Sequence, residues 1–151
     1  MTHSKPLVSV ATCCEKVLVE RDGVTSAIRI VDTFYVPESP TGEGIAQHVA
    51  VPVSVLIVLK SGDVVGESDI SLQLNAPDGT VIAFPDRFPL LLTGGEQGAN
   101  INVNFLLPAQ KPGLYWLEVL WGVDVLTKIP IKLVRVAAIP PAEVEQRKYP
   151  S

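Results

Sequence analysis

Cysteine and histidine are both scarce in this sequence of 151 residues. The two cysteines, Cys13 and Cys14, are adjacent, and the two histidines, His3 and His48, lie far apart in the chain. A zinc site needs three or four Cys, His or carboxylate ligands, and isolated aspartates in turns usually serve local backbone hydrogen bonds instead of calcium. The sequence therefore predicts no metal site and no cofactor.

The cysteine pair suggests neither a disulfide nor a catalytic thiol. Neighbouring residues on a strand point to opposite faces, which makes a bridge between them geometrically poor. A reactive thiol needs a pKa lowered by a base, a cation or a helix N-terminus, whereas the carboxylate of Glu15 follows this pair directly. We expect reduced thiols, a cytoplasmic location and no catalytic residues. A thiol enzyme that uses Cys13, Cys14 and His48 is the catalytic alternative.

Two further absences concern partners. The basic residues form no cluster and the net charge is −4, so we expect no binding to the phosphate backbone of nucleic acid. The longest aliphatic run in the predicted strands, residues 55–59, is far shorter than the roughly 20 residues that span a bilayer. The first six residues also lack the apolar region of a secretory signal. We therefore expect no membrane partner.

What the sequence does contain is abundant β-branched residues and alternating apolar positions. Valine and isoleucine together number 32, and these residues favour strands over helices. Apolar and polar residues alternate in period two over residues 49–59, 68–75, 100–107 and 125–134, which is typical of half-buried strands. Weaker strands are predicted over residues 7–14, 17–20, 25–36, 80–84, 88–93 and 114–121.

Glycine and proline mark the turns between these strands. Turns are predicted around residues 21–23, 61–63, 76–79, 94–98 and 111–113, and these connections are too short for crossover helices. The pattern predicts an all-β, antiparallel two-sheet β-sandwich, immunoglobulin-like, of about 7–10 strands. Residues 1–136 form the single domain, with a mobile loop over residues 38–47 and a C-terminal tail over residues 137–151.

One carboxylate and one apolar strand face are the candidate functional features. Asp32 shares strand parity with Ile28 and Ile30, so it is a possible buried polar residue, with a position at a strand end as the alternative. Leu114, Trp116 and Leu120 would share the outer face of their strand if the residues between them face the core. Such an exposed apolar face marks a contact surface, unless the strand is covered on both sides.

Several short motifs resemble those of a family of small uncharacterised bacterial β-sandwich proteins. The resemblance covers roughly residues 7–136 and implies an immunoglobulin-like sandwich with no known activity, so it assigns no functional residues. The sequence departs from it at Trp121-Gly122-Val123-Asp124, where such proteins often have an Asp-Gly hairpin. The motifs are Ala11-Thr12-Cys13-Cys14-Glu15, Asp22-Gly23, Ile28-Arg29-Ile30-Val31-Asp32, Pro77-Asp78-Gly79, Pro112-Gly113-Leu114-Tyr115 and Ile129-Pro130-Ile131.

The functional prediction is a non-enzymatic interaction or accessory module that binds a protein, either itself or another chain. The alternative is a sandwich that binds a small ligand or carbohydrate. In that case Tyr35, Trp116 and Trp121 would stack on a sugar or heteroaromatic ring, provided that they line one surface.

Overall fold

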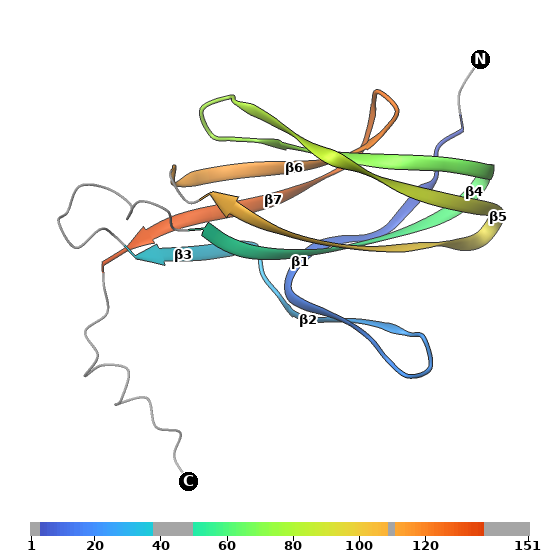
Figure 1. The fold of residues 1–151 in the computed structure, drawn as a ribbon, viewed down its shortest axis with the longest axis horizontal. Coiled ribbons are helices and arrows are strands. Elements are labelled where there is room, and N and C mark those ends of the chain that lie inside the picture. The colour runs from blue at the N-terminus through green and yellow to red at the C-terminus, as the bar shows by residue number, and fades with distance from the viewer. Residues whose placement is uncertain (1–3, 38–49, 109–110, 138–151) are drawn as a thin grey trace, which may run out of the picture.

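The computed structural model describes residues 4–37, 50–108 and 111–137, and these residues form seven β-strands (Figure 1). Within these ranges the chain has no helix, and hence none long and apolar enough to cross a membrane. The all-β part of the prediction is confirmed. The strands are β1 (Leu7–Val19), β2 (Thr25–Ile30), β3 (Thr33–Pro37), β4 (Ala50–Asn75), β5 (Val81–Pro108), β6 (Gly113–Trp121) and β7 (Asp124–Val136).

All seven strands are hydrogen-bonded into one sheet. The order is β2-β1-β4-β6-β7-β3, and β5 pairs with β4. Every pairing is antiparallel except that of β3 with β7, which is parallel. The prediction of a purely antiparallel fold is wrong at this pair, because a short connection constrains only strands that follow each other in the chain. Three strands separate β3 from β7 along the sequence.

Strands β4 and β5 are far longer than the sequence pattern predicts. Each merges segments that were predicted as separate strands, and the predicted turns at residues 61–63 and 94–98 lie inside them. The register shifts at this point, and Gly62 pairs with Gly95. Both glycines have positive φ, at 59° and 66°, a conformation that costs glycine little. The glycines therefore bend the two strands without ending them.

The sheet curls so that its two ends approach each other. Strands β2 and β3 stand at opposite ends of the strand order, yet only Val31 and Asp32 join them. The Val31 N–H donates to the Cys13 carbonyl (3.0 Å) on β1, and the Lys132 N–H on β7 donates to the Asp32 carbonyl (2.7 Å). This two-residue link ties the β1 side of the sheet to the β7 side, as Figure 1 shows.

One apolar core fills the inside of the curled sheet. The alternation predicted for the β4, β6 and β7 segments is found over residues 53–59, 70–74, 115–119 and 129–133, where every second residue is buried in one cluster. The predicted loop over residues 38–47 and residues 138–151 of the predicted tail lie outside the described residues. The fully or nearly fully buried residues of these three strands include Val53, Val55, Ile57, Leu59, Ile70, Leu72, Leu74, Tyr115, Leu117, Val119, Ile129, Ile131 and Leu133.

Candidate interaction surface

The outer side of β3, β6 and β7 carries the strongest candidate for a functional surface. Tyr115 and Leu117 on β6 and Ile131 on β7 are buried in the core, so their immediate neighbours point outward. The cross-strand register places Leu114 opposite Lys132 and Trp116 opposite Pro130. Tyr35 lies beside Val134 on the same side. We call this surface, made of Tyr35, Leu114, Trp116, Lys128, Pro130 and Lys132, the Trp116 face.

The apolar side chains of this face are open to solvent. Trp116 is 38% exposed, Leu114 is 41% exposed and Tyr35 is 67% exposed. Leu120, the third residue predicted for this surface, is only half-buried and lies where the β6–β7 register shifts, opposite Val125. An exposed tryptophan next to an exposed leucine is an energetically unfavourable feature on a solvated sheet, and such patches mark contact surfaces.

A buried carboxylate lies next to Trp116 on the same side of β6. Glu118 accepts hydrogen bonds from the Gln73 amide (2.7 Å) and the Asn75 amide (2.6 Å) of β4. The Lys128 ammonium lies 3.5 Å from Oε1 of Glu118, the oxygen that also accepts from Asn75. The Gln73 amide, followed by Asn75 and Lys128, holds the pKa of Glu118 below its usual value, although burial opposes this shift. Glu118 is therefore ionised and fixed, and it rigidifies the centre of the face.

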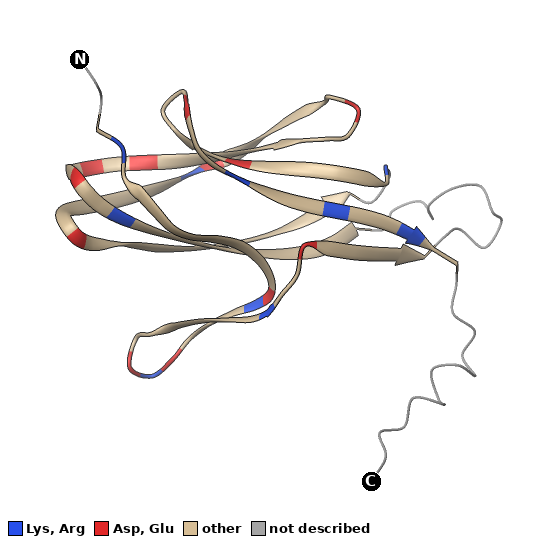
Figure 2. Cartoon of the chain, turned by 180° about the vertical axis from the view of Figure 1, so that it is seen from behind, with Lys and Arg blue, Asp and Glu red and all other residues tan. Residues whose placement is uncertain are grey.

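The exposed charges of this face are positive. From Leu126 to Val136, β7 carries Lys128, Lys132 and Arg135 and no carboxylate, and Figure 2 shows these cationic segments along the strand toward its C-terminal end. Lys132 is opposite Leu114 and Lys128 is opposite Glu118, so both lie diagonally from Trp116. Diagonal neighbours across two strands are about 7–8 Å apart. Trp116 is therefore flanked by two lysines, although the whole chain has a net charge of −4.

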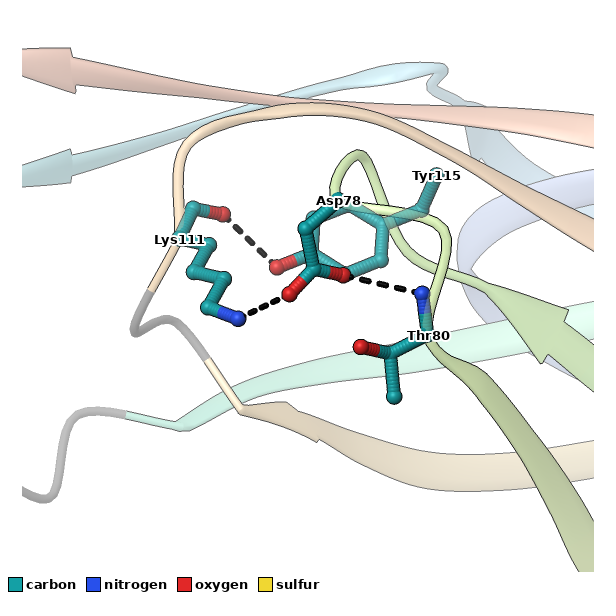
Figure 3. A network of polar contacts seen from close by, with 4 residues as sticks. All are labelled: Asp78, Thr80, Lys111 and Tyr115. Atoms are coloured by element: carbon teal, nitrogen blue, oxygen red, sulfur yellow. Dashed lines mark hydrogen bonds and ion pairs between the residues drawn. The ribbon is translucent and has the colours of Figure 1, made fainter.

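A second polar group ties the turn before β6 to the turn between β4 and β5 (Figure 3). The Lys111 ammonium pairs with the Asp78 carboxylate, and Asp78 also accepts from the Thr80 N–H (3.0 Å). The Tyr115 hydroxyl donates to the Lys111 carbonyl (2.7 Å). Lys111 holds the pKa of Asp78 well below its ordinary range, and burial raises the pKa of Tyr115.

These residues border a pocket of about 180 Å³, together with Ala76, Ile82 and Pro108. The pocket volume is below the roughly 300–1,000 Å³ of typical ligand sites. Among the described residues that line it, Lys111 is the only cation, and it is already paired with Asp78. The group is best explained as a clamp that holds the two turns together.

Asp32 is exposed in the link between β2 and β3, so the structure does not place it in the core. Its carboxylate accepts from the Thr33 hydroxyl (3.0 Å). It lines an open pocket of about 300 Å³ between β1 and β7, which Cys13 also lines. Burial, with smaller effects of Cys14 and Asp32, raises the pKa of the Cys13 thiol to about 12. A thiol that is protonated at neutral pH is a poor nucleophile.

The three aromatic residues of the carbohydrate alternative do not line one surface. Tyr35 and Trp116 lie on the Trp116 face, but Trp121 is at the far end of β6 and packs against the core. They do not form the common stacking platform that this alternative requires. Within the described residues, no group of three His, Cys, Asp or Glu side chains gathers in a geometry that could hold a metal ion.

The sequence pattern pointed to Leu114 and Trp116 but missed the polar part of the surface. Lys128 and Lys132 were visible only as the polar positions of an alternating strand, because their nearness to Trp116 depends on the β6–β7 register. In the sequence, Glu118 is one charged residue between the apolar positions Trp116 and Leu120. Its partners, Gln73 and Asn75, are more than 40 residues away in the chain, so no local signal could have found the cluster.

Comparison with known proteins places the fold but not the function. No family model and no curated protein sequence matches the chain. The chain is similar in structure to part of an alkylpurine DNA glycosylase, AlkC, from Pseudomonas fluorescens, solved bound to DNA that contains an abasic site analog. The TM-score is 0.54 at 10% identity, over 87% of this chain and 31% of that one.

Two other solved structures are more distant. An immunoglobulin-like protein from Pseudomonas aeruginosa gives a TM-score of 0.40 at 14% identity, with 86% of this chain and 97% of that chain covered. A β-glucosidase from Listeria innocua gives 0.42 at 13% identity, with 92% of this chain and 17% of that chain covered. The chain thus spans less than a third of the length of the glycosylase and of the β-glucosidase. At these identities the similarity concerns the fold alone.

Proposed function

We propose that this protein is a non-enzymatic interaction module that binds another protein through the Trp116 face. The observation that carries the proposal is the pair of open apolar side chains, Trp116 and Leu114, on neighbouring outward positions of one strand. Tryptophan is the residue most enriched among binding hot spots, where truncation to alanine costs about 2 kcal/mol or more. The fixed Glu118 cluster beside it supplies a rigid base, which lowers the entropic cost of binding.

The chemistry of the described residues supports a binding role over a catalytic one. Cys13 and Cys14 are both buried and unbridged, and burial raises the pKa of each thiol. The ionised carboxylate Glu118 already has two amide donors and a lysine. Neither thiol nor carboxylate is therefore poised for nucleophilic or acid–base catalysis.

The charge of the face favours a different protein over a second copy of this chain. In a two-fold symmetric dimer the same patch meets itself, so Lys128 and Lys132 would face the lysines of the other copy. Like charges opposed across an interface are unfavourable. The proposal is therefore a hetero-complex in which this chain is monomeric on its own.

The proposal also covers the arrangement of the strands in two layers and the cellular location of the protein. The curled sheet would behave as an immunoglobulin-like β-sandwich, with β1, β2 and the adjacent parts of β4 and β5 as one layer and β3, β6 and β7 with the remaining parts as the other. The two unbridged thiols are those expected in a reducing cytoplasm.

The experiment compares the wild-type chain, Trp116→Asp and Val123→Asp as baits in native lysate. Val123 is 96% exposed in the turn between β6 and β7, so its substitution adds the same charge away from the face. A protein retained by wild type and by Val123→Asp is then purified, and its affinity is measured by calorimetry. We expect Trp116→Asp to weaken binding at least 30-fold, which corresponds to about 2 kcal/mol.

Leu114→Asp serves as a second variant, with circular dichroism to check that each variant is folded. Size-exclusion chromatography with light scattering is expected to give a monomer for the free wild-type chain. The proposal fails if every retained protein binds the folded Trp116→Asp and Leu114→Asp variants as well as wild type. A wild-type dimer that Trp116→Asp dissociates would replace the hetero-complex with self-association.

A further inference from the structure

We infer that the Trp116 face takes an extended acidic segment of the partner protein, with one apolar side chain between two carboxylates. This inference rests on the proposed function, and it names the chemistry of the partner. It is carried by three positions on β6 and β7, namely Trp116 and the two lysines that flank it, Lys128 and Lys132.

The first step is charge complementarity. Among the described residues of β3, β6 and the Leu126–Val136 part of β7, Glu118 is the only carboxylate, and it is buried against its amide donors. The nearest exposed carboxylate, Asp32, lies just before β3 in a pocket that Pro130 also lines. Lys132 is exposed. Lys128 is 56% exposed although it lies 3.5 Å from Glu118, and its ammonium has three donors. Both lysines can therefore receive a carboxylate from outside.

The second step is spacing. Lys128 and Lys132 are four residues apart on one strand, which corresponds to about 13 Å at 3.3 Å per residue. Pro130 lies halfway between them and pairs with Trp116. In an extended segment, residues i, i+2 and i+4 point to the same face and span the same distance of about 13 Å. Carboxylates at i and i+4 would reach the lysines while an apolar residue at i+2 meets Trp116.

The third step compares the extended form with a helical version of the same motif. On a helix, residues i and i+4 are only about 6 Å apart along the axis, which is half the spacing of the two lysines, so their carboxylates match Lys128 and Lys132 less well. On a helix, two acidic residues about 13 Å apart would be separated by eight or nine positions. No residue halfway between them would then lie on the same helix face as both. The spacing of this face therefore favours the extended form.

The test titrates the full-length ¹⁵N-labelled chain with two synthetic peptides. The first is Ser-Glu-Thr-Phe-Thr-Glu-Ser, and the matched control has Gln in place of both Glu residues. We expect chemical-shift changes confined to the Trp116 indole N–H and to the amides around Leu114 and Lys132. The Glu peptide should bind at least fivefold more tightly than the Gln peptide, and added salt should weaken only the former.

Two charge reversals separate a local effect from a change in net charge. Lys132→Glu should weaken binding of the Glu peptide at least tenfold, because it places a carboxylate of the protein next to a carboxylate of the peptide. Lys60→Glu changes the net charge equally at an exposed position on β4 and should change the affinity less than twofold. The inference is overturned by equal affinity for both peptides, by shifts that map elsewhere, or by no shifts at 2 mM peptide.

Failure of this inference is distinguishable from failure of the proposed function. If a purified partner binds Trp116→Asp more weakly but binds Lys132→Glu as well as wild type, the proposed function stands. The inference of an acidic segment is then wrong. A partner that is insensitive to Trp116→Asp and to Leu114→Asp would reject both.

Discussion

On the β1 side of the sheet the outward side chains Cys14 and Leu56 are 1% and 5% exposed, whereas on β6 the outward Leu114 and Trp116 are 41% and 38% exposed. All four lie outside the main core cluster, although at least one strand neighbour of each belongs to it. Cys14 and Leu56 are thus covered and Leu114 and Trp116 are open, although farther along β5 Leu106 is 65% exposed on the same side as Leu56.

The β1–β2 hairpin accounts for the covered side. Beyond its pairing with β4, the hairpin bends over the outer surface of β4 and β5. The Ser54 hydroxyl donates to the Glu15 carbonyl (3.4 Å), and the Asn100 amide donates to the Thr25 hydroxyl (3.0 Å). Among the described residues, no strand makes the equivalent contact with β6. Leu114 and Trp116 are therefore accessible to a partner, whereas Leu56 is not.

The largest expected effect separates the covered leucine from the open one. Leu56→Ala should lower the free energy of unfolding by about 3 kcal/mol, because it leaves a cavity under the hairpin. Leu114→Ala should cost less than about 1 kcal/mol, because its side chain already contacts water. Urea denaturation of both variants at pH 7 measures the difference. Equal losses would show that the two faces are alike in solution and that β6 is covered.

The second prediction concerns the fixed carboxylate that makes the open face rigid. Glu118→Ala should lower the free energy of unfolding by about 2 kcal/mol, since it removes the charged acceptor of two amide donors. Asn102→Ala, an exposed change on the outer side of β5, should stay within about 0.5 kcal/mol. The same denaturation experiment measures both. A loss below 0.5 kcal/mol for Glu118→Ala would mean that the cluster contributes no rigidity.

The third prediction makes the comparison pH-dependent. Because the pKa of Glu118 is lowered in the folded chain, its contribution is present above the ordinary carboxyl pKa and is lost as the pH falls through the folded value. The stability gap between wild type and Glu118→Gln should be about 1 kcal/mol at pH 7. This difference in stability should shrink steadily as the pH falls below 4.5, the ordinary pKa of a glutamate carboxyl.

Asn104→Ala provides the matched control for this titration. The Asn104 amide oxygen accepts from the Ser54 hydroxyl (2.6 Å), and neither group ionises over this range. The difference in free energy of unfolding between Asn104→Ala and wild type should stay constant from pH 7 to pH 3. A Glu118→Gln gap that is equally constant would contradict the lowered pKa.

The alternation of side chains was enough to predict the fold class and the inner face. The buried positions of β6 and β7, such as Leu117 and Ile131, follow from period two alone. The pattern could not show that β4 and β5 are continuous, because the glycines that bend a strand have the same local signature as those that end one. The sequence therefore predicts turns at Gly62 and Gly95, which pair with each other inside β4 and β5.

The candidate surface was half predictable. Leu114 and Trp116 are outward by parity alone, but exposure depends on whether a distant segment covers them. Leu56 has an equally outward parity and is covered. The prediction for Asp32 fails for a different reason. Residues two apart point to the same side only within a continuous strand, so the comparison with Ile30 applies only if the strand extends to Asp32. The strand ends before Asp32, and the residue lies in the exposed link to β3.

The smallest expected effect tests what holds the hairpin over the covered face. The single hydroxyl proton of Ser54 has two acceptors, the Asn104 amide oxygen of β5 at 2.6 Å and the Glu15 carbonyl of β1 at 3.4 Å, so the contact with the hairpin is the weaker of the two. Because the pair of Ser54 and Asn104 is neutral and partly exposed, a double-mutant cycle with Ser54→Ala and Asn104→Ala should give a coupling of about 0.5 kcal/mol. Hydrogen exchange of the β2 amides should be faster in Ser54→Ala and unchanged in Asn104→Ala. Unchanged exchange of the β2 amides in Ser54→Ala would show that this polar contact does not hold the hairpin, and would leave apolar burial of Leu56 as the dominant cause.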